Sequence, residues 1–258
     1  TVEILDRNTL ESRGTITGFK SPRQAINLND GYIYVSDWGS NAIYKVNVST
    51  SSIVDSLKNC NGPEGMFLAE GKLFAANSGG YVLDSSVSVY DLNNWTHEGN
   101  IQVGINPIEI IDDALGNLWV LCSGYSDWNG TGGDRYSSLI SFDPKTSNIL
   151  TDYTNPILTD HPSKLRSNLA GNKLYFIQDS YVGNVMEFSI NQVSYPTQPL
   201  ISHSAYGLAI DGLNGNLLVL DALDYQSPGK ALLYADSGNI IDSSSVGLIP
   251  SVAINTKY

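Results

Sequence analysis

The sequence predicts an all-β protein of the β-propeller class, built from four-stranded blades. A Pro-led apolar segment, a tight turn with Gly and a second apolar run recur at intervals of about 41 to 55 residues. Apolar residues alternate with polar ones, as at Ile33 and Val35 or at Val87 and Val89, and no stretch sustains the 3.6-residue period of an amphipathic helix. A repeat of this length that holds four short strands is typical of propeller blades and not of helical solenoids.

Five repeats begin near residues 21, 62, 106, 161 and 204, and each predicts one blade with strands A to D in chain order. The turns between strands A and B contain Gly, because tight hairpins need residues that tolerate positive φ. These turns are Asp30-Gly31, Glu70-Gly71, Gly116-Asn117, Gly171-Asn172 and Gly215-Asn216. Blades stacked in this way form one domain, so residues 1–258 are expected to be a single propeller domain.

The two ends of the chain predict partial blades. Residues 1–20 resemble strands C and D of the other repeats, and residues 249–258 resemble a strand A. Joined in a six-bladed ring, these segments would lack a strand B and would leave backbone groups unpaired. We therefore expect that N-terminal strands preceding Thr1 are missing from this chain and that the parent ring is seven-bladed, with a six-bladed ring as the alternative.

The composition argues against nucleic acid as a partner. The chain has 26 acidic and 14 basic residues and a net charge of -12, which argues against nucleic acid, since affinity there comes from Lys and Arg at phosphates. No apolar run reaches the length of a transmembrane segment. The two cysteines, Cys60 and Cys122, are too few for a disulfide scaffold, and we expect buried free thiols, with a bridge between them as the alternative.

The loops between strands B and C vary in length and carry many of the aromatic residues, among them Tyr81. Loops on a rigid scaffold are where binding residues concentrate, so these loops predict a recognition surface; the alternative is that several of the rings only cover blade edges. The predicted ligand-binding residues are Arg23, Trp38, Glu64, Asn77, Tyr125, Trp128, Tyr136, His161, Tyr181, His203, Tyr206 and Tyr225.

The longest of these loops, residues 123–136, has two interpretations. Asp127, Asn129 and Thr131, followed by Gly132, match the oxygen-rich opening of a calcium loop, with Asp134 as a further carboxylate, but Ser138 stands where such a loop ends in a bidentate Glu. The favoured interpretation is a Gly-rich lid whose aromatic residues contact a ligand or partner. No cofactor is expected to be required, and calcium at Asp127, Asn129 and Asp134 is the alternative.

Two histidines, His161 and His203, are predicted to lie at nearly the same place in consecutive blades, just before strand A. Imidazoles placed in this way bind a transition metal or a ligand, or serve as hydrogen-bonded turn residues. The third histidine, His97, is predicted on an outer strand D.

The segments VEILDRNTLE, SPRQAINLNDGYIYVSDWGSNAIYKVN and GPEGMFLAEGKLFAANSGG resemble the surface-layer-type propeller lipoproteins of Bacteroidetes. This family is related to lactonase-like and quinoprotein-like propellers and to cobalamin-capturing surface propellers. The resemblance implies a seven-bladed, exported protein at the cell surface or in the periplasm, and for some relatives a partnership with an outer-membrane corrinoid transporter. No corrinoid-binding motif carries over to residues of this chain.

These observations favour a non-enzymatic, exported propeller that binds a small, bulky ligand, with a corrinoid as one candidate and an outer-membrane transporter as a partner. A protein–protein interaction scaffold at the cell surface is the second hypothesis. The third is a divalent-metal-dependent, lactonase-like or lyase-like hydrolase, for which Glu64, Asn77, Glu109 and Asp179 are loosely placed candidates. No Ser-His-Asp order or nucleophile elbow is present in the sequence.

Overall fold

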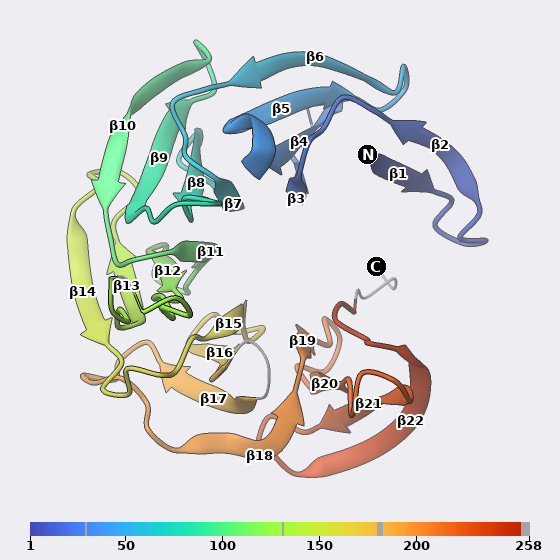
Figure 1. Cartoon of the computed structure of the whole chain (residues 1–258), viewed down its shortest axis with the longest axis vertical. Coiled ribbons are helices and arrows are strands. Elements are labelled where there is room, and N and C mark those ends of the chain that lie inside the picture. Colours follow the sequence, from blue (N-terminus) through green and yellow to red (C-terminus); the bar gives the residue numbers. More distant parts are fainter. Residues whose placement is uncertain (29, 131, 180–182, 254–258) are drawn as a thin grey trace. The chain divides into compact units, whose positions relative to one another are not determined.

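The computed structural model describes residues 1–28, 30–130, 132–179 and 183–253. These residues form twenty-two strands and one three-residue 3-10 helix, η1 (Trp38–Ser40), as Figure 1 shows. The expectation of an almost helix-free chain is confirmed, and none of the helical structure in the described part is long or apolar enough to cross a membrane. The chain divides into two compact units, Thr1–Ile110 with Asp143–Ile149 (unit 1) and Ile111–Phe142 with Leu150–Tyr258 (unit 2), which are described one at a time.

Five sheets have four strands each, hydrogen-bonded in chain order, and one has two. They are the predicted blades of a β-propeller, with strands A to D in each. Blade 1 is β3 (Pro22–Asn27), β4 (Tyr32–Asp37), β5 (Ala42–Asn47) and β6 (Ser52–Leu57); blade 2 is β7 (Pro63–Ala69), β8 (Lys72–Asn77), β9 (Ser86–Asp91) and β10 (Thr96–Gln102); blade 3 is β11 (Pro107–Asp112), β12 (Leu118–Cys122), β13 (Ser138–Phe142) and β14 (Ile149–Thr154); blade 4 is β15 (Ser163–Ser167), β16 (Lys173–Ile177), β17 (Gly183–Ser189) and β18 (Pro199–Ala205); blade 5 is β19 (Gly207–Ile210), β20 (Leu217–Asp221), β21 (Pro228–Tyr234) and β22 (Ile240–Leu248).

The core lies between neighbouring blades. Strand B is almost wholly buried, as in β8 and β12, because it pairs with a strand on each side and has an apolar layer on its faces. Within unit 1, Tyr34 and Ile43 of blade 1 pack with Met66 and Leu73 of blade 2 in one cluster. The outer strands are polar and exposed, β22 most clearly, which suits strands that end a sheet in water.

The N-terminal segment folds as predicted, into a hairpin of β1 (Val2–Leu5) and β2 (Ser12–Ile16) that resembles strands C and D. Val2 and Ile4 of this hairpin pack against the buried cluster of Ile16, Val35 and Val46. The predicted strand A at residues 249–258 is not formed over residues 249–253, and residues 254–258 lie outside the described part.

Both cysteines are buried and neither forms a disulfide, so the expectation of separate thiols is confirmed. Burial raises the pKa of the Cys60 thiol to about 11. A thiol with so high a pKa is almost entirely protonated at neutral pH, and a protonated thiol is a poor nucleophile.

Each sheet has two ends of different character. Because the strands are antiparallel, the A–B and C–D turns share one end, called here the turn end, while the B–C loops and the D–A crossings share the other, called the loop end. At the turn end of blade 3, the buried Asp113 accepts hydrogen bonds from the backbone N–H groups of Leu115 (2.8 Å) and Asn117 (3.0 Å) and from the indole Nε1 of Trp119 (2.8 Å).

We expect Asp113→Ala to lower the free energy of unfolding by about 2–4 kcal/mol, because it leaves the buried Trp119 indole N–H and two backbone donors unpaired. Urea unfolding followed by tryptophan fluorescence measures the loss. The matched control is Asp211→Ala in the corresponding turn of blade 5, where the carboxylate accepts from Leu213 N and Asn214 Nδ2, and where we expect a loss of about 1 kcal/mol or less. Equal losses in the two variants would contradict this role of Asp113.

Candidate functional site

The loop end is fixed by the last residue of strand B. Asp37 ends β4, is fully buried, and accepts hydrogen bonds from the backbone N–H groups of Lys20 (2.8 Å) and Ser21 (3.0 Å) through one oxygen and of Ser40 (2.8 Å) through the other. Asn77 ends β8 and accepts from the N–H of Asn61 (3.2 Å). In both blades a buried polar side chain therefore joins the D–A crossing to the start of the B–C loop.

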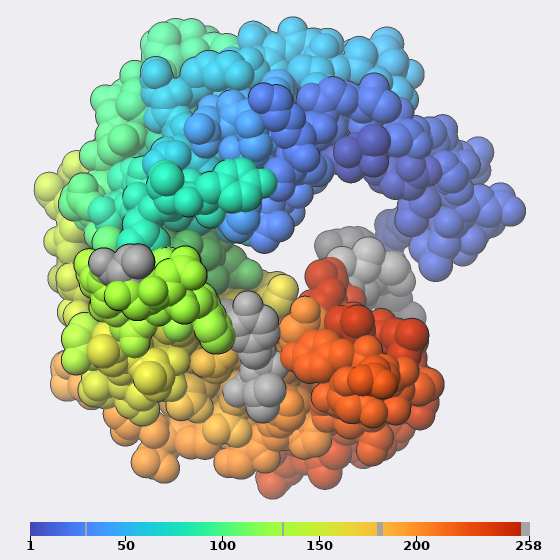
Figure 2. All heavy atoms as spheres, viewed as in Figure 1, coloured from blue at the N-terminus to red at the C-terminus, as the bar shows by residue number. Residues whose placement is uncertain are grey.

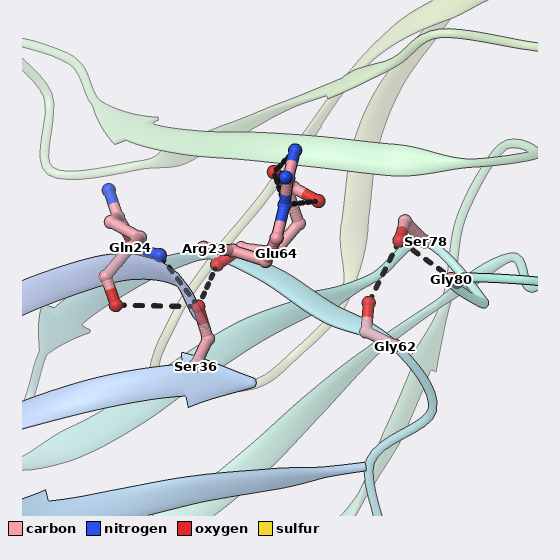
Figure 3. A network of polar contacts seen from close by, with 7 residues as sticks. All are labelled: Arg23, Gln24, Ser36, Gly62, Glu64, Ser78 and Gly80. Carbon is pink, nitrogen blue, oxygen red and sulfur yellow. Dashed lines mark hydrogen bonds and ion pairs between the residues drawn. The ribbon is translucent and has the colours of Figure 1, made fainter. Parts of the chain in front are cut away.

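Three predicted residues of unit 1 meet at this end. Arg23 donates to both carboxylate oxygens of Glu64, from Nε at 3.0 and 3.1 Å, and its Nη2 lies 3.0 Å from Oε1. The guanidinium carbon lies 4.2 Å from the ring centroid of Trp38, so the cation also stacks on the indole. Figure 3 shows the guanidinium and the carboxylate side by side above the strands.

Strand A carries a β-bulge that turns these side chains toward one another. In blade 1, Pro22 pairs with Asp37 and Ala25 with Val35, so two residues stand opposite the single Ser36. Blade 2 repeats the shift between Pro63 and Met66, and blade 4 between Ser163 and Arg166. Bulges re-aim side chains and are frequent beside functional sites.

The buried Ser36 joins the two bulges. Its Oγ accepts from Gln24 N (3.1 Å) and donates to the carbonyl of Glu64 (2.7 Å), as Figure 3 shows. The Gln24 side chain in turn accepts from Met66 N. Strand A of blade 1 is thus held against strand A of blade 2 by side chains, and the ion pair sits on a fixed base.

The B–C loop of blade 2 closes over Trp38. Ser78 donates from N (3.0 Å) and Oγ (2.8 Å) to the carbonyl of Gly62, and Gly80 N donates to Ser78 Oγ (3.2 Å). A Cβ on Gly62, whose φ is +55°, would lie 2.1 Å from Gly80 N, so only glycine allows this close approach. Beyond Gly80, Tyr81 meets Trp38 edge-on, with ring centroids 6.4 Å apart.

The tip of this loop is apolar and faces solvent. Tyr81, Val82 and Leu83 are 84%, 61% and 43% exposed. The turquoise segment of Figure 2 shows the loop standing on the visible surface of unit 1. Three consecutive exposed apolar residues next to a stacked Arg–Trp pair form a contact surface of mixed chemistry, unlike single apolar residues scattered over a surface.

Glu64 has an unusual electrostatic environment. Burial raises the pKa of its carboxyl, the Arg23 guanidinium partly offsets this, and the neighbouring Glu109 carboxylate raises the pKa further. Strand A of blade 3 comes close because Gly65 has no side chain: a Cβ there would lie 2.8 Å from the Glu109 Cα. The site therefore joins two carboxylates and one guanidinium.

In unit 2, the loop of residues 123–136 is a small closed hairpin. Tyr125 and Arg135 exchange backbone hydrogen bonds (3.1 and 2.8 Å), and one oxygen of Asp127 accepts from the N–H groups of Gly132 and Gly133, both at 2.7 Å. These backbone bonds lower the pKa of Asp127. Asp134 accepts from Asp127 N (2.8 Å), so both carboxylates close the loop on itself.

The same hairpin presents aromatic rings to solvent: Trp128 is 80% and Tyr136 is 50% exposed. Asn129 is also exposed, and Thr131 lies outside the described residues. Among the described residues of the chain, no group of three or more His, Cys, Asp or Glu side chains is arranged to hold a metal ion. The calcium interpretation of Asp127, Asn129 and Asp134 stays an alternative prediction.

The two histidines do not occupy equivalent places. His161 precedes β15 as predicted, and its Nδ1 lies 2.9 Å from the carbonyl of Ser123. His203 lies inside β18, a strand D, and its Nε2 contacts Oδ2 of Asp221 at 2.9 Å. Asp221 ends strand B of blade 5. In blades 1 and 2 the residue at this position accepts hydrogen bonds from backbone N–H groups of the D–A crossing. In blade 5 the His203 imidazole contacts the carboxylate at that place.

The remaining predicted residues fall into three situations. Tyr206, in a D–A crossing, and Tyr225, in a B–C loop, meet edge-on with centroids 5.4 Å apart. Asn77 is buried and its amide donates to Ser86 and Ser88, so its side chain has a structural role. Tyr181 lies outside the described residues, Asp179 belongs to unit 2, and His97 lies on β10, a strand D, as predicted.

Sequence reasoning named Arg23, Trp38 and Glu64 separately and did not pair them. It missed Ser36 and Gln24, which fix their geometry. The sequence did contain a signal for this ion pair. The residue directly after Pro is basic in the first repeat, Arg23, and acidic in the next, Glu64.

Comparison with known proteins shows the fold alone. Neither a protein-family profile nor a curated protein sequence matches the chain. Among solved structures, the hydrazine synthase of Kuenenia stuttgartiensis matches with a TM-score of 0.75 and 13% identity, over 96% of this chain and 81% of that one. A quinoprotein alcohol dehydrogenase-like protein of Bacteroides thetaiotaomicron matches with a TM-score of 0.68 and 15% identity, over 95% of this chain and 60% of that one.

A gluconolactonase of Xanthomonas campestris matches with a TM-score of 0.57 and 15% identity, over 90% of this chain and 77% of that one. The chain therefore has the fold of a β-propeller, similar in architecture to these three proteins. Since one scaffold serves many activities, its own function has to be argued from its site.

We expect the stability of the Glu64→Gln variant, relative to that of the wild type, to increase as pH rises. A folded-state pKa above the unfolded value of about 4.3 means that ionising Glu64 costs stability; this cost is absent below the unfolded pKa and grows as pH rises through the folded pKa. The difference in thermal midpoint, variant minus wild type, should therefore increase between about pH 4 and pH 7.

Glu3→Gln is the control of opposite sign. Hydrogen bonds from Ser12 and Thr15 lower the pKa of Glu3, so its ionised form stabilises the fold above the unfolded pKa and that stabilisation is lost as pH falls through the folded value. Its variant-minus-wild-type difference should fall with rising pH. A falling difference for Glu64→Gln as well would mean that Arg23 outweighs burial at Glu64.

Proposed function

We propose that this propeller captures a small, bulky ligand at its loop end without chemically changing it. The observation that carries the proposal is the site of unit 1, where Arg23 is fixed between Glu64 and Trp38 while Tyr81, Val82 and Leu83 stand exposed beside it. A rigid polar base next to exposed apolar rings is the usual composition of a ligand site.

The chemistry of the site favours a ligand with a large apolar face and hydrogen-bond acceptors. Arg23 has five N–H donors, and the bonds to Glu64 use those of Nε and Nη2. The Arg23 side chain is 39% exposed, so its other N–H groups can meet an acceptor on the ligand. Trp38 and Tyr81 supply aromatic surface for a flat or bulky body.

A corrinoid is the specific ligand that we propose, because it combines a large apolar ring with amide acceptors and because the sequence resembles propellers among whose relatives are cobalamin-capturing proteins. On the same grounds we propose an exported protein, at the cell surface or in the periplasm, that acts with an outer-membrane transporter. These assignments rest on the resemblance and on the fit of the site chemistry.

A second candidate function, a protein–protein interaction scaffold, is favoured by the hairpin of unit 2. Trp128 protrudes from a loop that closes on itself, and an exposed Trp on a rigid loop is a typical anchor for a protein partner. Co-purification of a partner without uptake of any small ligand would favour this candidate.

A third candidate, a divalent-metal-dependent hydrolase, is favoured by the proximity of the Glu64 and Glu109 carboxylates. It requires a bound cation, because the carboxylates alone supply no nucleophile. Elemental analysis of the purified protein, with a Glu64→Gln variant that should lose the metal, tests it.

Calorimetric titration of cobalamin tests the proposed function. We expect saturable binding to the wild-type protein, and Tyr81→Ala and Trp38→Ala should each weaken it by about 1–3 kcal/mol, roughly 5- to 150-fold, through loss of a stacked ring. No heat with cobalamin or with other corrinoids would refute the corrinoid. Binding unchanged in both variants would refute the site.

Trp128→Ala tests the hairpin of unit 2 as a protein-binding surface. Loss of this exposed ring should weaken the affinity for a co-purified protein partner by about 1–3 kcal/mol. Leu115→Ala, an exposed apolar residue at the turn end of the same unit, is the matched control and should leave that affinity unchanged. Unchanged partner affinity in Trp128→Ala would refute a binding role for the hairpin.

A further inference from the structure

At the turn end of unit 1, away from the site just described, three aromatic rings surround one ammonium group. Lys45 Nζ lies 4.2 Å from the ring centroid of Tyr32, 5.0 Å from that of Trp95 and 5.7 Å from that of Tyr34. The nearest carboxylate oxygen, Oδ2 of Asp30, is 3.7 Å away. We call Tyr32, Tyr34, Trp95 and Asp30 the cation cage.

The cage is held in shape by both neighbouring blades. Tyr32 and Tyr34 are two residues apart on β4 and therefore face the same side, and Lys45 on β5 pairs directly with Tyr34. Asp30 accepts from the Tyr32 N–H (3.1 Å) and from the Tyr34 hydroxyl. Trp95 comes from the C–D turn of blade 2, with its ring 5.4 Å from that of Tyr34.

Trp95 occupies a conformation that a bulky side chain avoids. Its φ is +59°, and the same turn position is left-handed in three other C–D turns, where it holds Leu10, Ser51 and Ser147. A left-handed backbone is unfavourable for a bulky residue, and such strain gathers at ligand clamps. The indole N–H of Trp95 is buried and has no hydrogen-bond partner among the described residues, so Trp95 contributes the face of its ring to the cage and not its N–H group.

We propose that the cation cage is a binding site for a methylated ammonium group, and that the Lys45 ammonium occupies it until such a cation arrives. Aromatic cages of this composition recognise quaternary ammonium ions through the negative faces of their rings. Lys45 is a suitable occupant to displace, since a primary ammonium is strongly hydrated and regains its water on release, whereas a methylated ammonium has less hydration to lose. The Lys45 side chain is 24% exposed, so it has a path to solvent.

Tyr32, one wall of the cage, also borders a surface cavity of about 450 Å³ whose other lining residues are Asn27, Gly31, Ile33 and Val48. Ile33 lies on the face of β4 opposite to Tyr32 and Tyr34, so this cavity does not extend the cage itself. The ligand class therefore follows from the cage alone: a small organic cation with a methylated ammonium head.

Lys45 acts as an internal competitor, so removing it should reveal the site. When a site is open for only a fraction of the time, the apparent dissociation constant is the intrinsic one divided by that fraction. If Lys45 fills the cage for about nine-tenths of the time or more, Lys45→Ala should tighten binding at least about tenfold.

The test is calorimetric titration of tetramethylammonium and of choline, at constant ionic strength, into the wild-type protein, Lys45→Ala and Lys45→Gln. We expect both variants to bind about tenfold or more tightly than the wild type. Adding Trp95→Ala to Lys45→Ala should abolish binding. The neutral isostere of choline, 3,3-dimethylbutan-1-ol, should not bind.

The matched control is Lys58→Ala, which removes a lysine facing the ring of Tyr44 at 5.5 Å, outside the cage. It should leave ammonium binding at the wild-type level, as should Tyr81→Ala, which belongs to the loop end. Thermal unfolding of each variant establishes that it is folded. Failure of both folded Lys45 variants to bind, or equal binding of the neutral isostere, would overturn the proposal.

Discussion

The hydrogen bond between the end of strand B and the D–A crossing is the constraint on which the rest of this structure depends. A B–C loop can vary only if its first residue is fixed, and the crossing into each blade has backbone N–H groups that need an acceptor. Buried Asp37 meets both needs in blade 1, and Asn77 does so in blade 2. The aromatic and charged groups at the loop end are therefore displayed from a fixed base.

This arrangement explains why an ion pair is found on a scaffold whose core is apolar. Arg23 and Glu64 lie on strands that are already held together by Ser36 and by the apolar cluster of Tyr34, Met66 and Leu73. A partly buried ion pair adds little net stability, because desolvation offsets much of the attraction. Stacking on Trp38 fixes the N–H donors of Arg23 beside an apolar loop. Such an arrangement serves ligand recognition more than folding.

The blades could be predicted from the sequence because each depends on local information. Alternating apolar residues, Gly in the A–B turns and the recurring Pro specify strands and turns within about 45 residues, and the structure has them at those places. The contacts that make the sites could not be predicted in the same way. Arg23 meets Glu64, and Lys45 meets Trp95, only after two blades have packed, and a single sequence contains no periodic signal for such pairs. His203, predicted just before strand A, lies in β18 because strand D of blade 4 extends to Ala205, two residues before β19 begins.

The repeated bulge in strand A also bears on how such a protein changes over evolutionary time. The first bulged residue is Arg23 in blade 1, Glu64 in blade 2 and Lys164 in blade 4, a charged residue in each case. A bulged residue lies outside the regular ladder, so its side chain can be exchanged without breaking the pairing of its neighbours. Mutation can thus change the charged residue at one blade after another while the sheets stay the same, and a lineage can acquire a new ligand preference without a change of fold.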